Sequence, residues 1–348
     1  MTTAAADKPG YWQIAAGSLG RDYADSFVRY GMAFVGGKRK IATMAKVKAG
    51  DRMLLKRGLS EVIAVGRVVA RDGKATGDLD KPWLRDFDGW DLSAYCYVEW
   101  HCPDKPYRTR GLTRATIRRA NQGHLLELAE QVLRDVSARA GVSPEPAPTQ
   151  GVDDAEILEF LIREGLRPSA AEDLTTAFRR IRLLARYYYR ECKWEDIREH
   201  ETRTFLILPL LLALGWPEQH LKIELAAGGK RVDVACFSRP YRRDANGHAN
   251  DDDCALILES KGFSQGLDYA PKQAKGHAEH FQKCRAVVVS NGYCYKAYRR
   301  EGDHTFSQTP SAYLNLLNPQ DRYPLDPQNV MGCLKLLQLL LPSSGVRD

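Results

Sequence analysis

The sequence lacks the usual signatures of a structural zinc site, a membrane span and a nucleotide-driven motor. Its eight cysteines are scattered, with no CxxC pair and no histidine at zinc-finger spacing, which argues against a structural zinc. No run approaches the roughly 20 apolar residues that span a bilayer, and no basic and apolar export signal opens the chain. A GxxxxGK(S/T) phosphate loop is also absent. We therefore expect a cytoplasmic protein with reduced thiols, no membrane partner and no ATPase activity of its own.

The length of the chain bounds the number of domains, and its net charge bears on the kind of partner. The chain has 348 residues, of which 44% are hydrophobic, and this length predicts two domains with separate cores. Its net charge of +7 suits a polyanionic partner such as nucleic acid, although many enzymes with neutral substrates are equally basic. Charge alone therefore does not decide the function.

A segment rich in proline and small polar residues, Gly141 to Gly151, separates two stretches of different character. Such residues favour neither helices nor a core, so we expect a linker over 139–152. Short apolar runs between glycines predict a β-rich domain over 1–138. Helical periodicity and then alternating apolar runs predict an α/β domain over 153–348. The expected strands are Tyr11 to Ala15, Met32 to Val35, Arg52 to Lys56, Val62 to Val69 and Tyr95 to Trp100 before the linker, and Leu221 to Leu225, Val232 to Phe237, Ala255 to Leu258 and Ala286 to Ser290 after it.

Asp233, Glu259 and Lys261 are the strongest candidates for chemistry. Asp233 lies in RVDVACF, where alternation places it on the face opposite Val232 and Val234. An aspartate among apolar strand residues is unfavourable unless something pairs with it. Glu259 ends the next apolar run, and Lys261, two residues later, points to the same side. One face is thus expected to carry an acid and a base.

Such residues suit the hydrolysis of a phosphodiester. The reaction needs a divalent ion, and Mg²⁺ prefers carboxylate oxygens and retained waters. Asp233, Glu259 and the backbone carbonyl of Ser260 are the expected ligands, with Mn²⁺ as a substitute ion. Lys261 is expected to position the attacking water or to stabilise the developing charge. The alternative is a surface ion pair, because Glu-x-Lys triplets are common in a chain that is 27% charged.

The stretch 201–298 resembles the PD-(D/E)xK nuclease domain found at the N-terminus of type I restriction subunits. The motifs that carry the resemblance are ETRTFLILPLLLALGW, RVDVACF, LILESKG, a glutamine-bearing helix and AVVVSNGYCYKAY, in this order. The resemblance implies a restriction-endonuclease-like mixed sheet flanked by helices, and an Mg²⁺-dependent endonuclease that acts on duplex DNA. By position, the catalytic core matches Asp233, Glu259 and Lys261, the helix glutamine matches Gln273, and an acid of the first helix matches Glu201. At the place of a frequent family tyrosine this sequence has His277.

Two of these assignments have simpler interpretations. Glu201 would lie on the same helix side as Phe205, Leu208 and Leu212, which we expect to face the core. It is also explained as an acid near a helix N-terminus, where the helix dipole favours negative charge. His277 has no metal-ligating partner at suitable spacing, so we interpret it as a phosphate contact or a surface histidine.

The N-terminal stretch resembles another group of domains. GYWQIAAGSLGRDYADSFVRYGMAFVGG, followed by AGDRMLLKRG and EVIAVGRVVA, is similar to the EVE and YTH domains of the PUA-like superfamily. The resemblance implies a β-barrel that holds a modified base between aromatic side chains. Trp12, Tyr23 and Trp83 are the expected walls, chosen from a set that also contains Trp90 and Trp100. The alternative is that these tryptophans form the core of a small barrel.

Together these features predict an α+β or α/β two-domain protein, with an N-terminal PUA-like β-barrel and a C-terminal nuclease fold. The predicted function is a modification-dependent endonuclease for restriction or phage defence. Cleavage of both strands needs two active sites, which favours a homodimer or pairing of two copies on DNA. The alternative function is a non-catalytic reader of modified DNA or RNA whose nuclease half is a scaffold.

Overall fold

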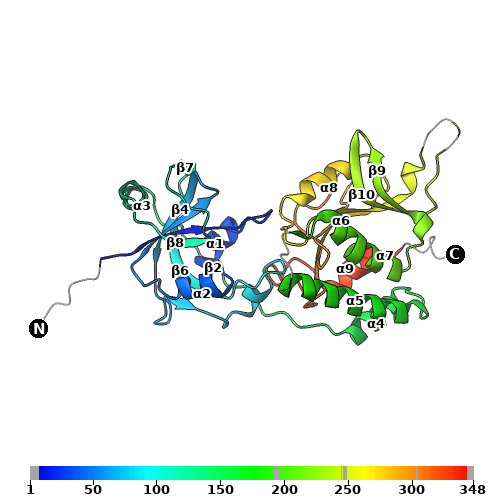
Figure 1. The fold of residues 1–348 in the computed structure, drawn as a ribbon, viewed down its shortest axis with the longest axis horizontal. Coiled ribbons are helices and arrows are strands. Elements are labelled where there is room, and N and C mark those ends of the chain that lie inside the picture. The colour runs from blue at the N-terminus through cyan, green and yellow to red at the C-terminus, as the bar shows by residue number, and fades with distance from the viewer. Residues whose placement is uncertain (1–7, 192–195, 244, 246–248, 303–304, 343–348) are drawn as a thin grey trace, which may run out of the picture. The chain divides into compact units, whose positions relative to one another are not determined.

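In the computed structural model, the chain separates by its internal contacts into two compact units, Met1–Glu145 and Pro146–Asp348 (Figure 1). The structure describes residues 8–191, 196–243, 245, 249–302 and 305–342. The division between the units falls inside the segment predicted as a linker. Ser143 still donates its backbone N–H to the carbonyl of Arg29 in the first unit, whereas Val152 donates to the carbonyl of Pro319 in the second.

The first unit is built on one curled sheet, with the strand order β2-β6-β4-β3-β1-β8. Strand β5 pairs with β6, and β7 pairs with β4. The sheet bends into a half-barrel (Figure 1). Gly66 allows this close packing, because a Cβ atom there would lie 2.2 Å from the side chain of Val98. The strands are β1 (Tyr11–Ala15), β2 (Met32–Val35), β3 (Arg52–Arg57), β4 (Glu61–Val68), β5 (Thr76–Gly77), β6 (Ala94–His101), β7 (Tyr107–Arg108) and β8 (Ile117–Arg119).

Short helices and an aromatic core complete the first unit. The helices are α1 (Ala24–Tyr30), α2 (Lys38–Met44), the 3-10 helix η1 (Pro82–Asp86) and α3 (Gly123–Asp135). Phe34 of β2 lies at the centre of the core, with ring centroids 4.3 Å from Phe27 and 4.7 Å from Phe87. Each large apolar side chain buried in this way stabilises the fold by roughly 1.5–3 kcal/mol.

The second unit contains a six-stranded mixed sheet with the order β14-β13-β12-β11-β10-β9. Only the pair β11 and β12 is parallel; the other neighbours are antiparallel. A parallel pair needs a crossover connection, and α8 (Ala270–Ala278) lies in that connection. The strands are β9 (Leu221–Ala227), β10 (Lys230–Phe237), β11 (Cys254–Ser260), β12 (Ala286–Ser290), β13 (Cys294–Arg299) and β14 (Ala312–Asn315).

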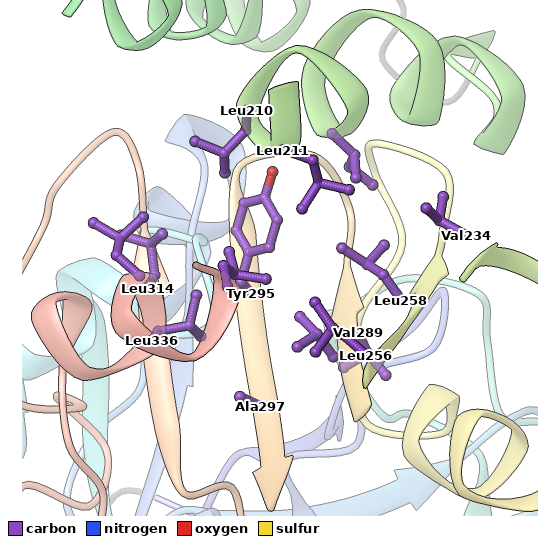
Figure 2. Close-up of a cluster of buried hydrophobic side chains, with 14 of the residues drawn as sticks. Leu210, Leu211, Val234, Leu256, Leu258, Val289, Tyr295, Ala297, Leu314 and Leu336 are labelled. Carbon is purple, nitrogen blue, oxygen red and sulfur yellow. The ribbon is translucent and has the colours of Figure 1, made fainter. Parts of the chain in front are cut away.

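Helices cover both faces of this sheet. Helix α8 packs on β10, β11 and β12, and the rings of Phe237 and Phe281 meet on that face. On the other face, Leu210 and Leu211 of α7 and Leu336 of α9 point towards strand side chains such as Leu258 (Figure 2). The remaining helices are α4 (Asp154–Arg163), α5 (Ala170–Arg190), α6 (Glu199–Thr202), α7 (Leu208–Ala213), the 3-10 helices η4 (Glu218–His220) and η5 (Asp251–Asp253), and α9 (Cys333–Leu340).

A π-helical segment, η3 (Arg203–Ile207), joins α6 to α7 and changes which side chains are buried. Phe205 is 43% exposed and Leu212 is 41% exposed, whereas Leu206 and Leu211 are fully buried. The prediction that Phe205 and Leu212 face the core is therefore wrong. A π-helical turn contains one residue more than an α-helical turn, so a periodicity of 3.6 residues does not carry through it.

At the coarse level, the predicted mixture of helices and strands and the mixed second sheet are confirmed. The assignments of the first sheet to the PUA-like superfamily and of the second to a nuclease fold stay predictions.

Candidate metal centre

Three carboxylates from three separate elements converge in the second unit. They belong to Glu199 of α6, Asp233 of β10 and Glu259 of β11, and one oxygen from each lies within 4.8 Å of the others. Glu259 is fully buried, and the other two are half-buried. This is the only such group of three potential ligands among the described residues.

The strand register explains why Asp233 and Glu259 meet. Strands β10 and β11 are antiparallel, and Val234 lies opposite Leu258. Asp233 and Glu259 are the next residues along each strand, so their side chains leave the sheet on the same face. That face is the one covered by α8.

Both oxygens of Asp233 are held by neighbours. Oδ2 accepts hydrogen bonds from the backbone N–H of Ser260 at 2.7 Å and from its hydroxyl at 2.8 Å. Oδ1 accepts one from the guanidinium of Arg203 at 3.1 Å, and the same guanidinium donates to Glu224 at 2.6 Å. The side chain of Arg203 is only 5% exposed, so this buried cation fixes the carboxylate and partly balances its charge.

Glu259 is held on one oxygen only. Its Oε1 accepts a 2.6 Å hydrogen bond from Nζ of Lys261, which also donates to Gln273 at 3.4 Å. Its Oε2 is buried and has no hydrogen-bond partner, and the Nδ1 atom of His277 lies 3.4 Å away from it. Burial raises the pKa of Glu259 to about 7, the hydrogen bond from Lys261 opposes this, and the charge of Asp233 adds to it.

The crowding of acids also affects Glu199. Burial raises its pKa; the charge of Lys261 opposes this, and the neighbouring Asp233 adds to it. Carboxylates packed this closely repel one another unless protons or a cation neutralise them. The donor set consists of oxygens, one of which is buried without a partner, and this fits a hard divalent ion such as Mg²⁺, Mn²⁺ or Ca²⁺.

Most of the predicted site residues meet at this place. Asp233, Glu259, Lys261 and Gln273 lie together as expected, and Ser260 is adjacent, with its N–H and hydroxyl used to hold Asp233. The assignment of the Ser260 carbonyl as a metal ligand stays a prediction.

The acid supplied by the first helix is Glu199, not the predicted Glu201. Two residues on a helix point about 200° apart, so both cannot reach the same cluster. Glu201 is half-buried, and it is not part of the group. Glu199 was missed because the motif used for the resemblance begins at Glu201, and no local pattern marks the earlier acid.

Of the two interpretations of His277, the structure excludes the surface histidine, and the phosphate contact stays a prediction. His277 is 7% exposed and lies beside Glu259, so it is not a surface histidine. Burial lowers its pKa.

In the first unit, all three predicted base-binding residues are buried in the core. Trp12 is 2% exposed and donates to Asp51 at 2.8 Å. Trp83 packs on the ring of Tyr30 at 4.9 Å. Both tryptophans therefore agree with the alternative interpretation, in which they belong to the hydrophobic core of the first unit.

Tyr23, the third predicted wall residue, is 4% exposed and packs on the ring of Phe87 at 4.4 Å, and it also lines a small cavity. The cavity has a volume of about 30 Å³, and Phe34, Gly36, Lys40 and Trp90 are also in its lining. Trp90 is half-buried, and the guanidinium of Arg21 lies 3.8 Å from its ring centroid. Of the wider set of aromatic candidates, Tyr23 and Trp90 are the pair found at this cavity.

Comparisons with known proteins add no family assignment: no protein-family model matches the chain, and no curated protein matches its sequence. In the described part of the chain, no helix combines the length and apolar character needed to cross a bilayer.

Proposed function

We propose that this protein is a metal-dependent endonuclease of the PD-(D/E)xK type that cleaves DNA. The observation that carries the proposal is the cluster of Glu199, Asp233 and Glu259, with Lys261 at 2.6 Å from Glu259. Acids on two adjacent strands, and a lysine two residues after the second acid, are the arrangement that the sequence resemblance implies.

A bound Mg²⁺ would neutralise charge on the scissile phosphate and lower the pKa of an attacking water. Asp233 and Glu259 would hold the ion, and Glu199 would complete the set of ligands. Lys261 sits next to both Glu259 and Gln273. From there its ammonium group is suited to orient the nucleophile and to stabilise the negative charge that develops on the phosphate.

We further propose that the first unit senses a modified base, and that the protein acts in modification-dependent restriction or phage defence. Stacking on Tyr23 and Trp90 would hold a flipped base. The cavity is smaller than a base, so Trp90 must move to admit one. Helix α2 and strand β8 pack together, and each exposes basic residues that suit the phosphates around such a base. These residues are Lys38, Arg39, Lys40, Arg118 and Arg119.

The test is cleavage of plasmid and linear DNA by the full-length protein. We expect nicking in Mg²⁺ that stops with EDTA and is lost in Asp233→Asn and Lys261→Ala, because each variant removes one part of the reaction centre. The matched controls are Asp252→Asn and Lys283→Ala, which alter an exposed ion pair with side chains 70% and 72% exposed. The controls should cleave as the wild type does. Equal cleavage by Asp233→Asn and the wild type would refute the proposal.

A non-catalytic reader is the second candidate. The observation that favours it is the saturation of Asp233 by Arg203 and Ser260, which is also what a structural aspartate would show. Binding of modified DNA without any metal-dependent cleavage would support this function instead.

A further inference from the structure

We propose that the exposed side of α5 binds the phosphate backbone of the duplex DNA that enters the metal centre. The proposal rests on the proposed nuclease function, and it assigns a binding surface to the same site. We call this surface the arginine face. It consists of Arg179, Arg180, Leu183, Arg186, Tyr187 and Arg190, all of which are exposed.

The arginine face follows from the periodicity of α5. One side of the helix is buried against the rest of the unit, and its residues run from Leu174 and Phe178 to Ala185 and Tyr188. The exposed residues repeat at intervals of three and four along the opposite side, which places them in one stripe. Leu183 is 58% exposed and Tyr187 is 53% exposed within this stripe. A basic stripe with interleaved apolar and aromatic groups is therefore open to a partner.

The charge of the arginine face is not balanced within the described part of the chain. No ion pair there involves any of its four arginines, whereas the neighbouring Arg182 pairs with Asp154 at 2.6 Å. Arg186 and Arg190 are one turn apart, and like charges at this spacing repel and destabilise a helix. Such an arrangement is most favourable when an anion occupies the surface.

The residue type points to phosphate. Helix α5 contains five arginines and no lysine. A planar guanidinium can donate two parallel hydrogen bonds to phosphate oxygens, which an ammonium cannot. Arg179 and Arg190 are eleven residues apart, a rise of about 16 Å at 1.5 Å per residue. Since phosphates repeat roughly every 3.4 Å along each strand, this length allows the arginines to reach separate phosphates.

The C-terminal end of α5 is tied to the metal centre. The ring of Tyr188 lies 5.4 Å from that of Phe263, which follows Lys261 by two residues. Phe263 in turn donates its backbone N–H to the carbonyl of Ile197 at 3.1 Å, two residues before Glu199. The C-terminal end of α5 thus lies next to the segments that carry Lys261 and Glu199.

A second copy of the chain fits this surface less well. Two identical faces related by a twofold axis would place arginines against arginines, which is electrostatically unfavourable. The charge therefore favours a polyanion as the occupant.

The test measures DNA binding in EDTA, so that it does not depend on catalysis. The full-length wild type and the variants Arg179→Ala/Arg180→Ala and Arg186→Ala/Arg190→Ala are titrated into a labelled unmodified duplex at several salt concentrations. Alanine is the best helix former, and thermal unfolding checks that the variants fold. The matched control is Arg163→Ala/Arg167→Ala. Both arginines are exposed; Arg163 is the last residue of α4, and Arg167 lies four residues after it.

We expect each α5 variant to reduce the slope of log K against log salt by about 1 to 2, since each lost phosphate contact changes it by roughly 0.9. The control should keep the wild-type slope. Unchanged slopes in both α5 variants would overturn the proposal, as would a change only in oligomeric state or tighter binding of a matched RNA duplex. A failure of the proposed nuclease function would be seen in a different experiment, as unchanged DNA cleavage by Asp233→Asn.

Discussion

Glu259 is the residue at which burial and charge compete most strongly. It is fully buried at the end of a central strand and has only Lys261 as a hydrogen-bonded cation. Its neighbours Asp233 and Glu199 both add negative charge. Without a metal ion, a proton is the simplest way to neutralise this carboxyl, and that explains the direction of its pKa.

This pKa predicts how the stability of the metal-free protein depends on pH. The folded-state pKa of Glu259 is about 7, against an ordinary value of 4.5. A raised pKa means that the folded state binds the proton more tightly than the unfolded state. The contribution to stability is present below about pH 4.5 and is lost as the pH rises to about 7. It is on the order of 3 kcal/mol at most.

Thermal unfolding in EDTA between pH 5 and pH 8 measures this effect. We expect the unfolding temperature of the wild type to fall over this range, and Glu259→Gln to flatten the curve because it cannot ionise. Added Mg²⁺ should restore the stability of the wild type at pH 8. Parallel curves for the wild type and Glu259→Gln would contradict the assignment.

At the scale of elements, the strands of the site follow from sequence patterns, and the helix beside them does not. Alternation predicts that Asp233 leaves β10 on the face opposite Val232 and Val234, and the register with β11 agrees. Strands repeat every two residues whatever their neighbours, so this inference is local. The π-helical turn at 203–207 has no comparable local signal, and it shifts the phase of every later residue in α7.

The phase shift predicts different results for two adjacent leucines. Leu211→Ala should lower the free energy of unfolding by about 2–5 kcal/mol, because it removes buried methyl groups that pack towards the sheet. Leu212→Ala, at a position that is 41% exposed, should change it by only about 0.5 kcal/mol. Urea unfolding of both variants makes the comparison. A larger loss in Leu212→Ala would show that the helix runs without the π turn.

The same limit explains the misplaced acid. Glu199 and Glu201 are both glutamates, and both lie within six residues of the apolar run that begins at Phe205. Only the three-dimensional path of α6 decides which of them reaches Asp233, and that path depends on packing far from either residue. Sequence therefore predicts the residues that the strands deliver and leaves open the one that the helix delivers.

At the scale of the whole molecule, we propose that the first unit recognises the modified base and the second unit cleaves the DNA. The tryptophans of the first unit differ in their burial. Trp12 and Trp83 are buried in the core, whereas Trp90 is half-buried at the cavity. From sequence alone all three are aromatic residues in a β-rich domain, so burial could not be assigned to each of them.

A single substitution at this cavity tests whether recognition of a modified base and cleavage of DNA belong to different units. Trp90→Ala should reduce the preference for modified over unmodified duplex about tenfold or more, because a stacked base loses roughly 1–3 kcal/mol. Trp90→Ala should still nick DNA in a metal-dependent reaction when the DNA is present in excess over the protein. The control Trp12→Phe should keep the preference and lower the unfolding temperature, since it removes the buried hydrogen bond to Asp51. Loss of preference in Trp12→Phe and not in Trp90→Ala would place the base elsewhere.

The convergence of Glu199, Asp233 and Glu259 on one metal ion is tested most directly by calorimetric titration of the metal-free protein with Mn²⁺. We expect binding by the wild type, at least tenfold weaker binding by Glu199→Gln, Asp233→Asn and Glu259→Gln, and wild-type affinity in Glu201→Gln. Absence of Mn²⁺ binding in the wild type, or a loss in Glu201→Gln that Glu199→Gln does not share, would contradict it.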